Sequence, residues 1–178
     1  MVAVISSEKK TTSETLTIPV NCNMVIALVS GATNPTINTV AMNQRITKNN
    51  SGTYVSISRM DSPPTGTIPF TLGQETRFVY LSDAGNETDV DGSTDGSAIT
   101  LTSSATDLIL GVQIDPGLGG GTMTADGASL TFLDNYYTGY LAAPDTSVVC
   151  DGDGTALAFI SIATLGTSTV DGSNIIVM

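Results

Sequence analysis

The chain has 178 residues, of which 40% are hydrophobic and 13% are charged. It is therefore long enough to bury a sizeable core and too apolar to be a disordered polymer. Its net charge is −11, and its six basic residues are scattered along the chain. Proteins that bind nucleic acid or anionic membranes carry clustered Lys and Arg, so neither is expected as a partner. The sequence also contains no histidine, which excludes Ser-His-Asp and Cys-His catalysis and histidine-based zinc sites.

Residues 1–13 begin with an apolar patch, Val2 to Ile5, which is followed by a polar stretch. We predict an N-terminal arm here, outside a single domain that spans residues 14–178. The start of the chain lacks a basic segment followed by a long apolar run, so no secretory signal is expected, and no apolar segment reaches the length of a membrane span.

The first half of the domain shows the apolar–polar alternation of half-buried strands. In Glu14–Val20, the side chains of Leu16, Ile18 and Val20 fall on one face. Met24–Val29 is a nearly continuous apolar strand. Further strands are predicted at Thr36–Met42 (with a bulge between Ile37 and Val40), Thr53–Met60, Thr67–Leu72 and Arg77–Leu81, with a hairpin loop at Asn49–Gly52 and a turn at Pro63-Pro64.

The passage Ser82–Ser97 has no clear strand pattern and is predicted to be an exposed loop between two halves of the domain. It contains Asp89, Asp91 and Asp95 among glycines, with Glu87 nearby. Oxygen-rich loops of this kind can hold calcium, but the spacing differs from that of an EF-hand. A solvated loop is the preferred interpretation, and calcium binding remains the alternative.

Ala98–Ile114 predicts a β-hairpin around which the second half is organised. Ile99 and Leu101 alternate with threonine, and Ser103–Thr106 forms the turn. One face of the following strand carries Leu108, Leu110, Val112 and Ile114. Later strands are predicted at Ala128–Leu133, Tyr136–Ala142, Ser147–Cys150, Thr155–Thr164 and Ser173–Met178.

The two halves, residues 14–84 and 97–165, show similar patterns at an offset of about 80 positions, the size of a repeated supersecondary unit. Leu16-Thr17-Ile18 before an apolar strand resembles Ile99-Thr100-Leu101 before the next one. We therefore predict an all-β fold: an antiparallel, jelly-roll-like β-sandwich built from two similar halves, with almost no helix. The predicted core contains Val25, Ile26, Leu28, Ile99, Leu101, Leu108, Leu110, Val112, Phe159 and Ile160.

No constellation of residues points to chemistry. Cys22 and Cys150 are interpreted as buried thiols, although a disulfide between them stays open. Tyr136, Tyr137 and Tyr140 are interpreted as packing or interface residues, with ligand stacking as the alternative. The glycine-rich stretch at 117–121 lacks the spacing of a dinucleotide-binding loop. The sequence predicts no catalytic, cofactor-binding or metal-binding residues, and the chain is not expected to be an enzyme.

Several segments resemble β-sandwich, jelly-roll-like virion structural proteins of tailed bacteriophages: Thr15–Val29, the turn Met60–Gly66 with its following strand, and Gly96–Val112. The resemblance extends over about residues 15–165 and implies a capsid decoration (cement) protein or a receptor- or glycan-binding fibre or adhesin module. As the former, the chain would be made in the host cytoplasm and would bind the major capsid protein on the outside of the head. It would also associate with itself, as a homotrimer. The Asp-rich passage and the loop at Gly117 depart from the family pattern.

The apolar termini suggest how such a protein would attach. We expect residues 1–13 and Ser173–Met178 to pair with neighbouring subunits or with the shell, because a free strand edge invites pairing with another chain.

Overall fold

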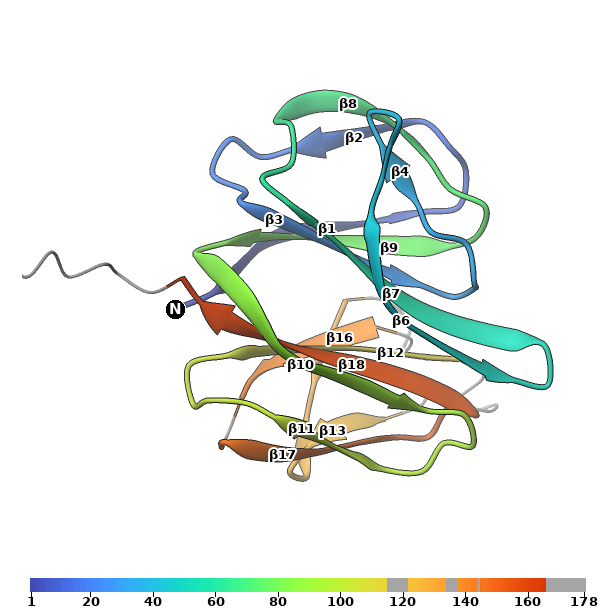
Figure 1. The fold of residues 1–178 in the computed structure, drawn as a ribbon, viewed down its shortest axis with the longest axis vertical. Helices are drawn as coiled ribbons and strands as arrows, with labels where there is room; N and C mark the ends of the chain where they lie inside the picture. Colours follow the sequence, from blue (N-terminus) through green and yellow to red (C-terminus); the bar gives the residue numbers. More distant parts are fainter. Residues whose placement is uncertain (115–121, 134–137, 144, 166–178) are drawn as a thin grey trace, which may run out of the picture.

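A computed structural model describes residues 1–114, 122–133, 138–143 and 145–165 (Figure 1). All of the regular elements in these residues are β-strands, and all of their pairings are antiparallel. The predicted all-β, antiparallel sandwich is confirmed. None of the described residues belongs to a helix long and apolar enough to cross a membrane.

The strands of the described residues fall into two sets of nine. The first set comprises β1 (Ala3–Lys10), β2 (Thr15–Ile18), β3 (Met24–Val29), β4 (Thr36–Ile37), β5 (Val40–Ala41), β6 (Asn43–Asn50), β7 (Thr53–Asp61), β8 (Gly66–Thr71) and β9 (Thr76–Ser82). The second comprises β10 (Ala84–Ser93), β11 (Ile99–Thr102), β12 (Leu108–Ile114), β13 (Met123–Ala125), β14 (Ala128–Ser129), β15 (Thr131–Phe132), β16 (Thr138–Ala142), β17 (Ser147–Gly152) and β18 (Ala156–Thr164).

The two sets have the same topology. The first forms sheets in the orders β1-β9-β3-β7-β6 and β2-β8-β4-β5, and the second forms β10-β18-β12-β16-β15 and β11-β17-β13-β14. Adding nine to each strand number of the first set gives the second. In each half the first strand lies beside the last and the second beside the next to last, which is the long-range pairing of a jelly roll. The similarity of the halves predicted from sequence is thus confirmed, and each half completes a two-sheet sandwich of its own.

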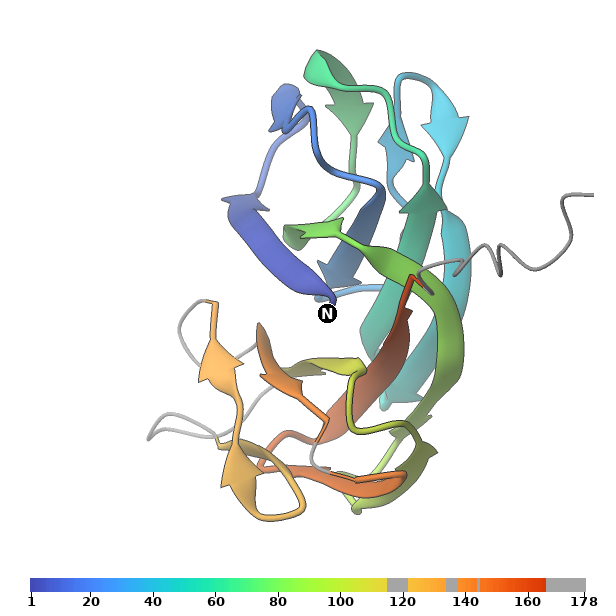
Figure 2. The same ribbon diagram turned by 90° about the vertical axis from the view of Figure 1, so that its left-hand side faces the viewer.

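The halves are stacked so that four sheets enclose three apolar cores (Figure 2). The outer cores lie within each half, between its five-stranded and four-stranded sheets. The middle core, which we call the shared core, lies between the two five-stranded sheets and contains Met24, Ile26 and Leu28 from one half and Leu108, Leu110 and Val112 from the other. All ten residues predicted to form the core are buried.

This arrangement explains the continuous apolar strands. In β3, Met24, Ile26 and Leu28 face the shared core while Val25, Ala27 and Val29 face the outer core of their own half. A strand that is buried on both faces loses the alternation of a half-exposed strand. The strands of the outer sheets retain this alternation, as in β2, where Leu16 and Ile18 are buried and Thr15 and Thr17 are exposed.

The predicted N-terminal arm is wrong, because residues 3–10 form strand β1, paired with β9 along its length. Val2 is 5% exposed and contributes to the shared core. The Tyr80 hydroxyl of β9 donates a hydrogen bond to the Glu8 carboxylate of β1. Strand β1 lies at the edge of its sheet and is held by backbone hydrogen bonds to β9. Such bonds do not require alternating apolar side chains, so the sequence pattern did not reveal this strand.

The predicted loop Ser82–Ser97 is also wrong for most of its length. Its residues 84–93 form β10, which pairs with β18. Asp83, with φ of 54°, is the only residue between β9 and β10 and turns the chain from the first half into the second. Strand β10 lies at the edge of its sheet, where Glu87 pairs with Arg45 of β6 and Asp91 pairs with Lys48.

Three local predictions need correction. The segments 99–102 and 108–114 do not form a hairpin, because β11 pairs with β17 while β12 pairs with β16 and β18 in a different sheet. The bulge predicted between Ile37 and Val40 is a two-residue turn at Asn38 and Thr39, whose φ angles of 50° and 66° are those of a tight hairpin. Val20 lies beyond the end of β2 and is 89% exposed.

The two cysteines are buried free thiols, as predicted, and do not pair. Cys22 belongs to the outer core of the first half and Cys150 to that of the second. Burial raises the pKa of both thiols, that of Cys150 to about 12.

Candidate functional site

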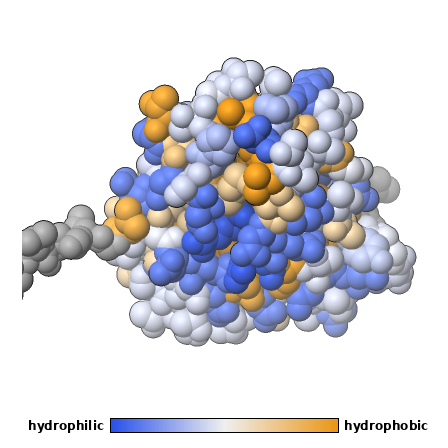
Figure 3. Space-filling view, turned by 45° about the horizontal axis from the view of Figure 1, so that its top comes forward, coloured by the Kyte–Doolittle hydropathy of each residue, from blue (hydrophilic) through white to orange (hydrophobic). Residues whose placement is uncertain are grey.

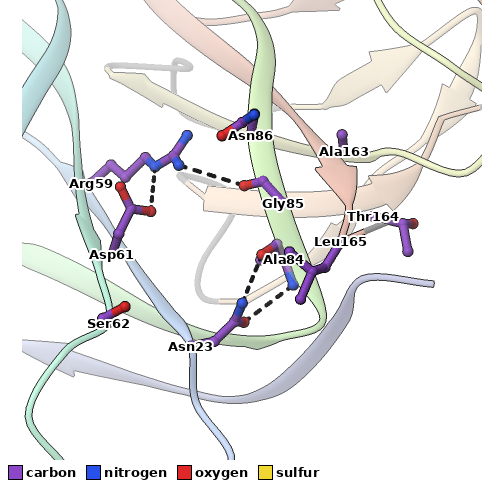
Figure 4. Close-up of a pocket in the computed structure, with 10 residues that line it drawn as sticks. All are labelled: Asn23, Arg59, Asp61, Ser62, Ala84, Gly85, Asn86, Ala163, Thr164 and Leu165. Carbon is purple, nitrogen blue, oxygen red and sulfur yellow. Dashed lines mark hydrogen bonds and ion pairs between the residues drawn. The ribbon is translucent and has the colours of Figure 1, made fainter. Parts of the chain in front are cut away.

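The best candidate for a binding site is a hollow at the junction of the two halves, with a volume of about 420 Å³. It is lined by the end of β7, the start of β10 and the end of β18, together with Asn23 from the turn before β3 (Figure 4). The single-residue connection at Asp83 brings these elements together, because the second half must begin where the first one ends.

Asn23 holds the junction closed. Its side-chain Nδ2 donates a hydrogen bond of 2.7 Å to the Ala84 carbonyl, and its Oδ1 accepts one of 3.1 Å from the Ala84 N–H. Its backbone N–H donates to the Leu81 carbonyl, and its carbonyl accepts from the Ser62 N–H. Both the Nδ2 and the Oδ1 of Asn23 are therefore engaged in positioning β10 against the first half (Figure 4).

Charged side chains along one wall of the hollow form neutral pairs. Arg59 Nε donates to Asp61 Oδ1 over 2.7 Å, and the two side chains are 13% and 59% exposed. A second hollow, of about 440 Å³, adjoins the first and includes Arg45, whose guanidinium binds both carboxylate oxygens of Glu87 at 2.7 and 3.0 Å. The hydrogen bond to Glu87 raises the pKa of Arg45. Since each guanidinium faces one carboxylate, this wall carries no net charge.

A third hollow, of about 340 Å³, shares Asp61 and Ser62 with the first and is more apolar. Its apolar lining comes from Ile37, Val40, Met60 and Pro64. Arg59, Asp61 and Asn86 line both the first and the second hollow, which we together call the junction trough. The third hollow lies on the opposite face of β7, because Met60 packs against the outer core of the first half while Arg59, its neighbour in the strand, points the other way. Figure 3 shows one face of the molecule, on which a hydrophilic patch is bordered by hydrophobic side chains.

The acidic residues considered for calcium are not gathered into one site. The described part of the chain contains no group of three or more His, Cys, Asp or Glu side chains that could hold a metal ion. Asp89 accepts hydrogen bonds from the backbone N–H groups of Val90 and Thr102, both at 2.8 Å. Asp95 accepts from the hydroxyls of Ser93 and Ser97, and these bonds lower its pKa. Both carboxylates thus accept hydrogen bonds from nearby groups of the chain.

The remaining predicted features fall partly outside the described residues. Tyr140, on β16, is partly buried against the shared core. Tyr136, Tyr137, the stretch 117–121 and the predicted strand Ser173–Met178 lie outside the described residues.

The sequence did not reveal the buried carboxylate Asp107, which is 2% exposed. It accepts hydrogen bonds from Thr88 Oγ1 at 2.7 Å, Ser161 Oγ at 3.0 Å and Ser104 Oγ. Burial alone would raise its pKa, but the three hydroxyl donors lower it overall. Asp107 directly precedes β12 as Asn23 directly precedes β3. Both polar residues therefore fasten the start of the corresponding strand in the two halves, and comparing the repeats could have identified the pair.

Comparison with protein-family models found no match, and comparisons with curated proteins and with solved structures found none either. Function is therefore inferred from the repeat architecture and the junction trough.

Proposed function

We propose that this chain is a non-enzymatic virion structural protein, a capsid decoration protein that binds the outside of a tailed-phage head and stabilises it. The observation that carries the proposal is the stack of four sheets around three cores. Stacking two jelly rolls on the shared core joins them into one block with broad outer sheets. Such a block suits a protein that must hold its shape while bound to a large surface.

The outer sheets offer a surface suited to binding without charge. Exposed threonines alternate with buried aliphatic residues, as at Thr15 and Thr17 in β2 and at Thr100 and Thr102 in β11. Hydroxyl groups donate and accept hydrogen bonds, and the net charge of −11 resides in other side chains. Binding to the major capsid protein is therefore expected to depend on burial and hydrogen bonds.

The proposed partners are the major capsid protein and further copies of this chain, assembled as a homotrimer on the capsid exterior after synthesis in the host cytoplasm. Nucleic acid and membranes are not among them. The attachment role of residues 1–13 is revised, because these residues are part of a sheet. Among the described strands, β1 lies at the edge of its sheet, and this edge is proposed to pair with a neighbouring chain.

The test mixes the purified protein with emptied phage heads that lack it and separates bound from free protein by sedimentation at low and high salt. Electron microscopy then locates the bound protein. Saturable binding that survives added salt is expected, because burial is screened much less than surface ion pairs are. Heads that bind none, when the same protein binds host cells, would refute the proposal.

Binding to host cells without binding to phage heads would favour the other function considered, a receptor- or glycan-binding module. The junction trough supports this alternative, because the amides of Asn43 and Asn86 line it without a hydrogen-bonding partner among the described residues. A glycan array probed with the labelled protein and with an Asn86→Ala variant tests it. Binding that requires Asn86 is the expected result for this function.

A further inference from the structure

Charge is divided unequally between the two halves. All six basic residues lie in residues 1–83, together with five of the 17 acidic residues, so this part has a net charge of +1. Residues 84–178 contain the other twelve acidic residues and no basic residue, so their net charge is −12. Two of these acidic side chains, Glu87 and Asp91, are paired with Arg45 and Lys48 of the first half.

The acidic half of one copy therefore repels that of another. Five of its acidic residues are exposed and belong to no ion pair among the described residues: Asp95, Asp126, Asp145, Asp151 and Asp153. Exposed like charges repel over a Debye length of about 10 Å at about 0.1 M salt, and a net charge far from zero keeps copies of a protein apart. Two copies of this chain meet the least repulsion when they approach through their first halves.

The outer sheet of the first half is uncharged. Its strands β2, β4, β5 and β8 contain no charged residue, and its exposed positions include Thr15, Thr17 and Thr67. This sheet forms the upper end of the molecule in Figure 1, away from the second half. Because burying an unpaired charge is costly and interface centres are depleted of charged residues, a sheet of this kind is suited to contact with another copy.

One end of this sheet carries both an apolar projection and an apolar hollow. Val20, in the turn that follows β2, is 89% exposed. The third hollow, of about 340 Å³, is lined by four apolar residues, Ile37, Val40, Met60 and Pro64. Since Ile18 of β2 pairs with Gly66 of β8, Val20 and Pro64 extend from the same end of this strand pair. The exposure of Val20 shows that it does not fill the hollow of its own chain.

We propose that copies of this chain associate through their first halves, with Val20 of one copy inserted into the third hollow of the next, against Val40 and Met60. Asp61 is the charged residue that lines this hollow, and it is paired with Arg59, so an apolar side chain is favoured there over a cation. Each copy provides one projection and one hollow, and contacts between two different surfaces can close into a ring. That the ring has three members rests on the homotrimer proposed above, whereas the contact itself does not.

Light scattering of the purified full chain over a range of concentrations measures its self-association. Val20→Asp should weaken association about tenfold or more, and tenfold corresponds to about 1.4 kcal/mol. Val149→Asp is the matched control, at a position 47% exposed on β17 in the outer sheet of the second half, and should change association less than about twofold. Thermal unfolding verifies that each variant is folded. Equal effects of the two substitutions, or a wild-type chain that stays monomeric up to about 1 mM, would overturn the proposal.

The direction of the salt dependence is a second readout of the same measurement. Raising salt from about 0.05 to about 0.5 M screens the repulsion between the acidic halves and leaves apolar burial in place, so association of the wild-type chain should become stronger. Contacts made by opposite charges would respond in the reverse direction. Association that weakens as salt is added would therefore contradict an apolar contact between the first halves.

Disulfide trapping identifies the two surfaces. Chains carrying Val20→Cys are mixed with chains carrying Val40→Cys and oxidised, and the native Cys22 and Cys150 are buried. Mass spectrometry should find position 20 of one chain bonded to position 40 of the other, at a much higher yield than for Val20→Cys mixed with Val149→Cys. Equal yields would refute the contact. A chain that neither associates nor cross-links but still binds emptied phage heads would overturn this inference and leave capsid decoration standing.

Discussion

Replacing Leu110 by alanine tests whether the shared core joins the two halves. Leu110 is fully buried in β12, in the core formed by both five-stranded sheets. The truncation removes methyl and methylene groups worth about 0.8 kcal/mol each and leaves a cavity, so leucine-to-alanine changes at such sites cost about 2–5 kcal/mol. We expect about 3 kcal/mol here, since backbone from β16 and β18 encloses the strand on both sides and limits collapse.

Equilibrium unfolding in urea and calorimetry measure the effect. For a domain of this size, a loss of about 3 kcal/mol lowers Tm by about 6–12 °C. Because the shared core contains residues of both halves, wild type and variant should each unfold in a single transition. Val149→Ala, at a position 47% exposed, is the matched control and should change stability by less than about 0.5 kcal/mol. A Leu110→Ala effect below that value would contradict the assigned burial, and two resolved transitions in the wild type would contradict the coupling of the halves.

Four further predictions follow from individual contacts. Asn23→Ala removes both hydrogen bonds to Ala84 and should cost about 1–3 kcal/mol in urea unfolding, whereas Asn86→Ala, which loses no hydrogen bond to a described residue, should be nearly neutral. The pKa of Asp107 is lowered in the folded state. Its ionised carboxylate therefore stabilises the fold above the unfolded pKa of about 3.9, and this stabilisation is lost as pH falls through the folded value. In the Asp107→Asn variant, the free energy of unfolding should decrease less steeply as pH is lowered. Cys150, with its pKa raised to about 12 and no solvent exposure, should react with a thiol reagent at pH 8 only at the rate of unfolding. Deleting residues 1–10 should lower Tm, because it removes β1 from its sheet. An unchanged Tm would instead support the interpretation of these residues as an arm outside the domain.

The sequence by itself determined the fold class and the core. Alternation in segments such as 15–18 and 99–102 predicted strands with one buried face, and both were found. The repetition of the pattern predicted two similar halves, because equivalent strands occupy equivalent layers. Aliphatic residues such as Leu110 and Ile160 in the continuous apolar strands are buried, since apolar surface leaves water in almost any arrangement of sheets.

Strand partners and the trough were decided by the tertiary structure alone. Strands β1 and β10 contain serine, glutamate, aspartate and lysine, and they are strands because β9 and β18 offer unpaired backbone groups at a sheet edge. The sequence could not show that β11 and β12 belong to different sheets, because pairing partners far along the chain decide this. The junction trough combines Arg59, Asp61, Asn86 and Leu165, which no local pattern connects. Their proximity follows from stacking one jelly roll on the other through a connection of a single residue.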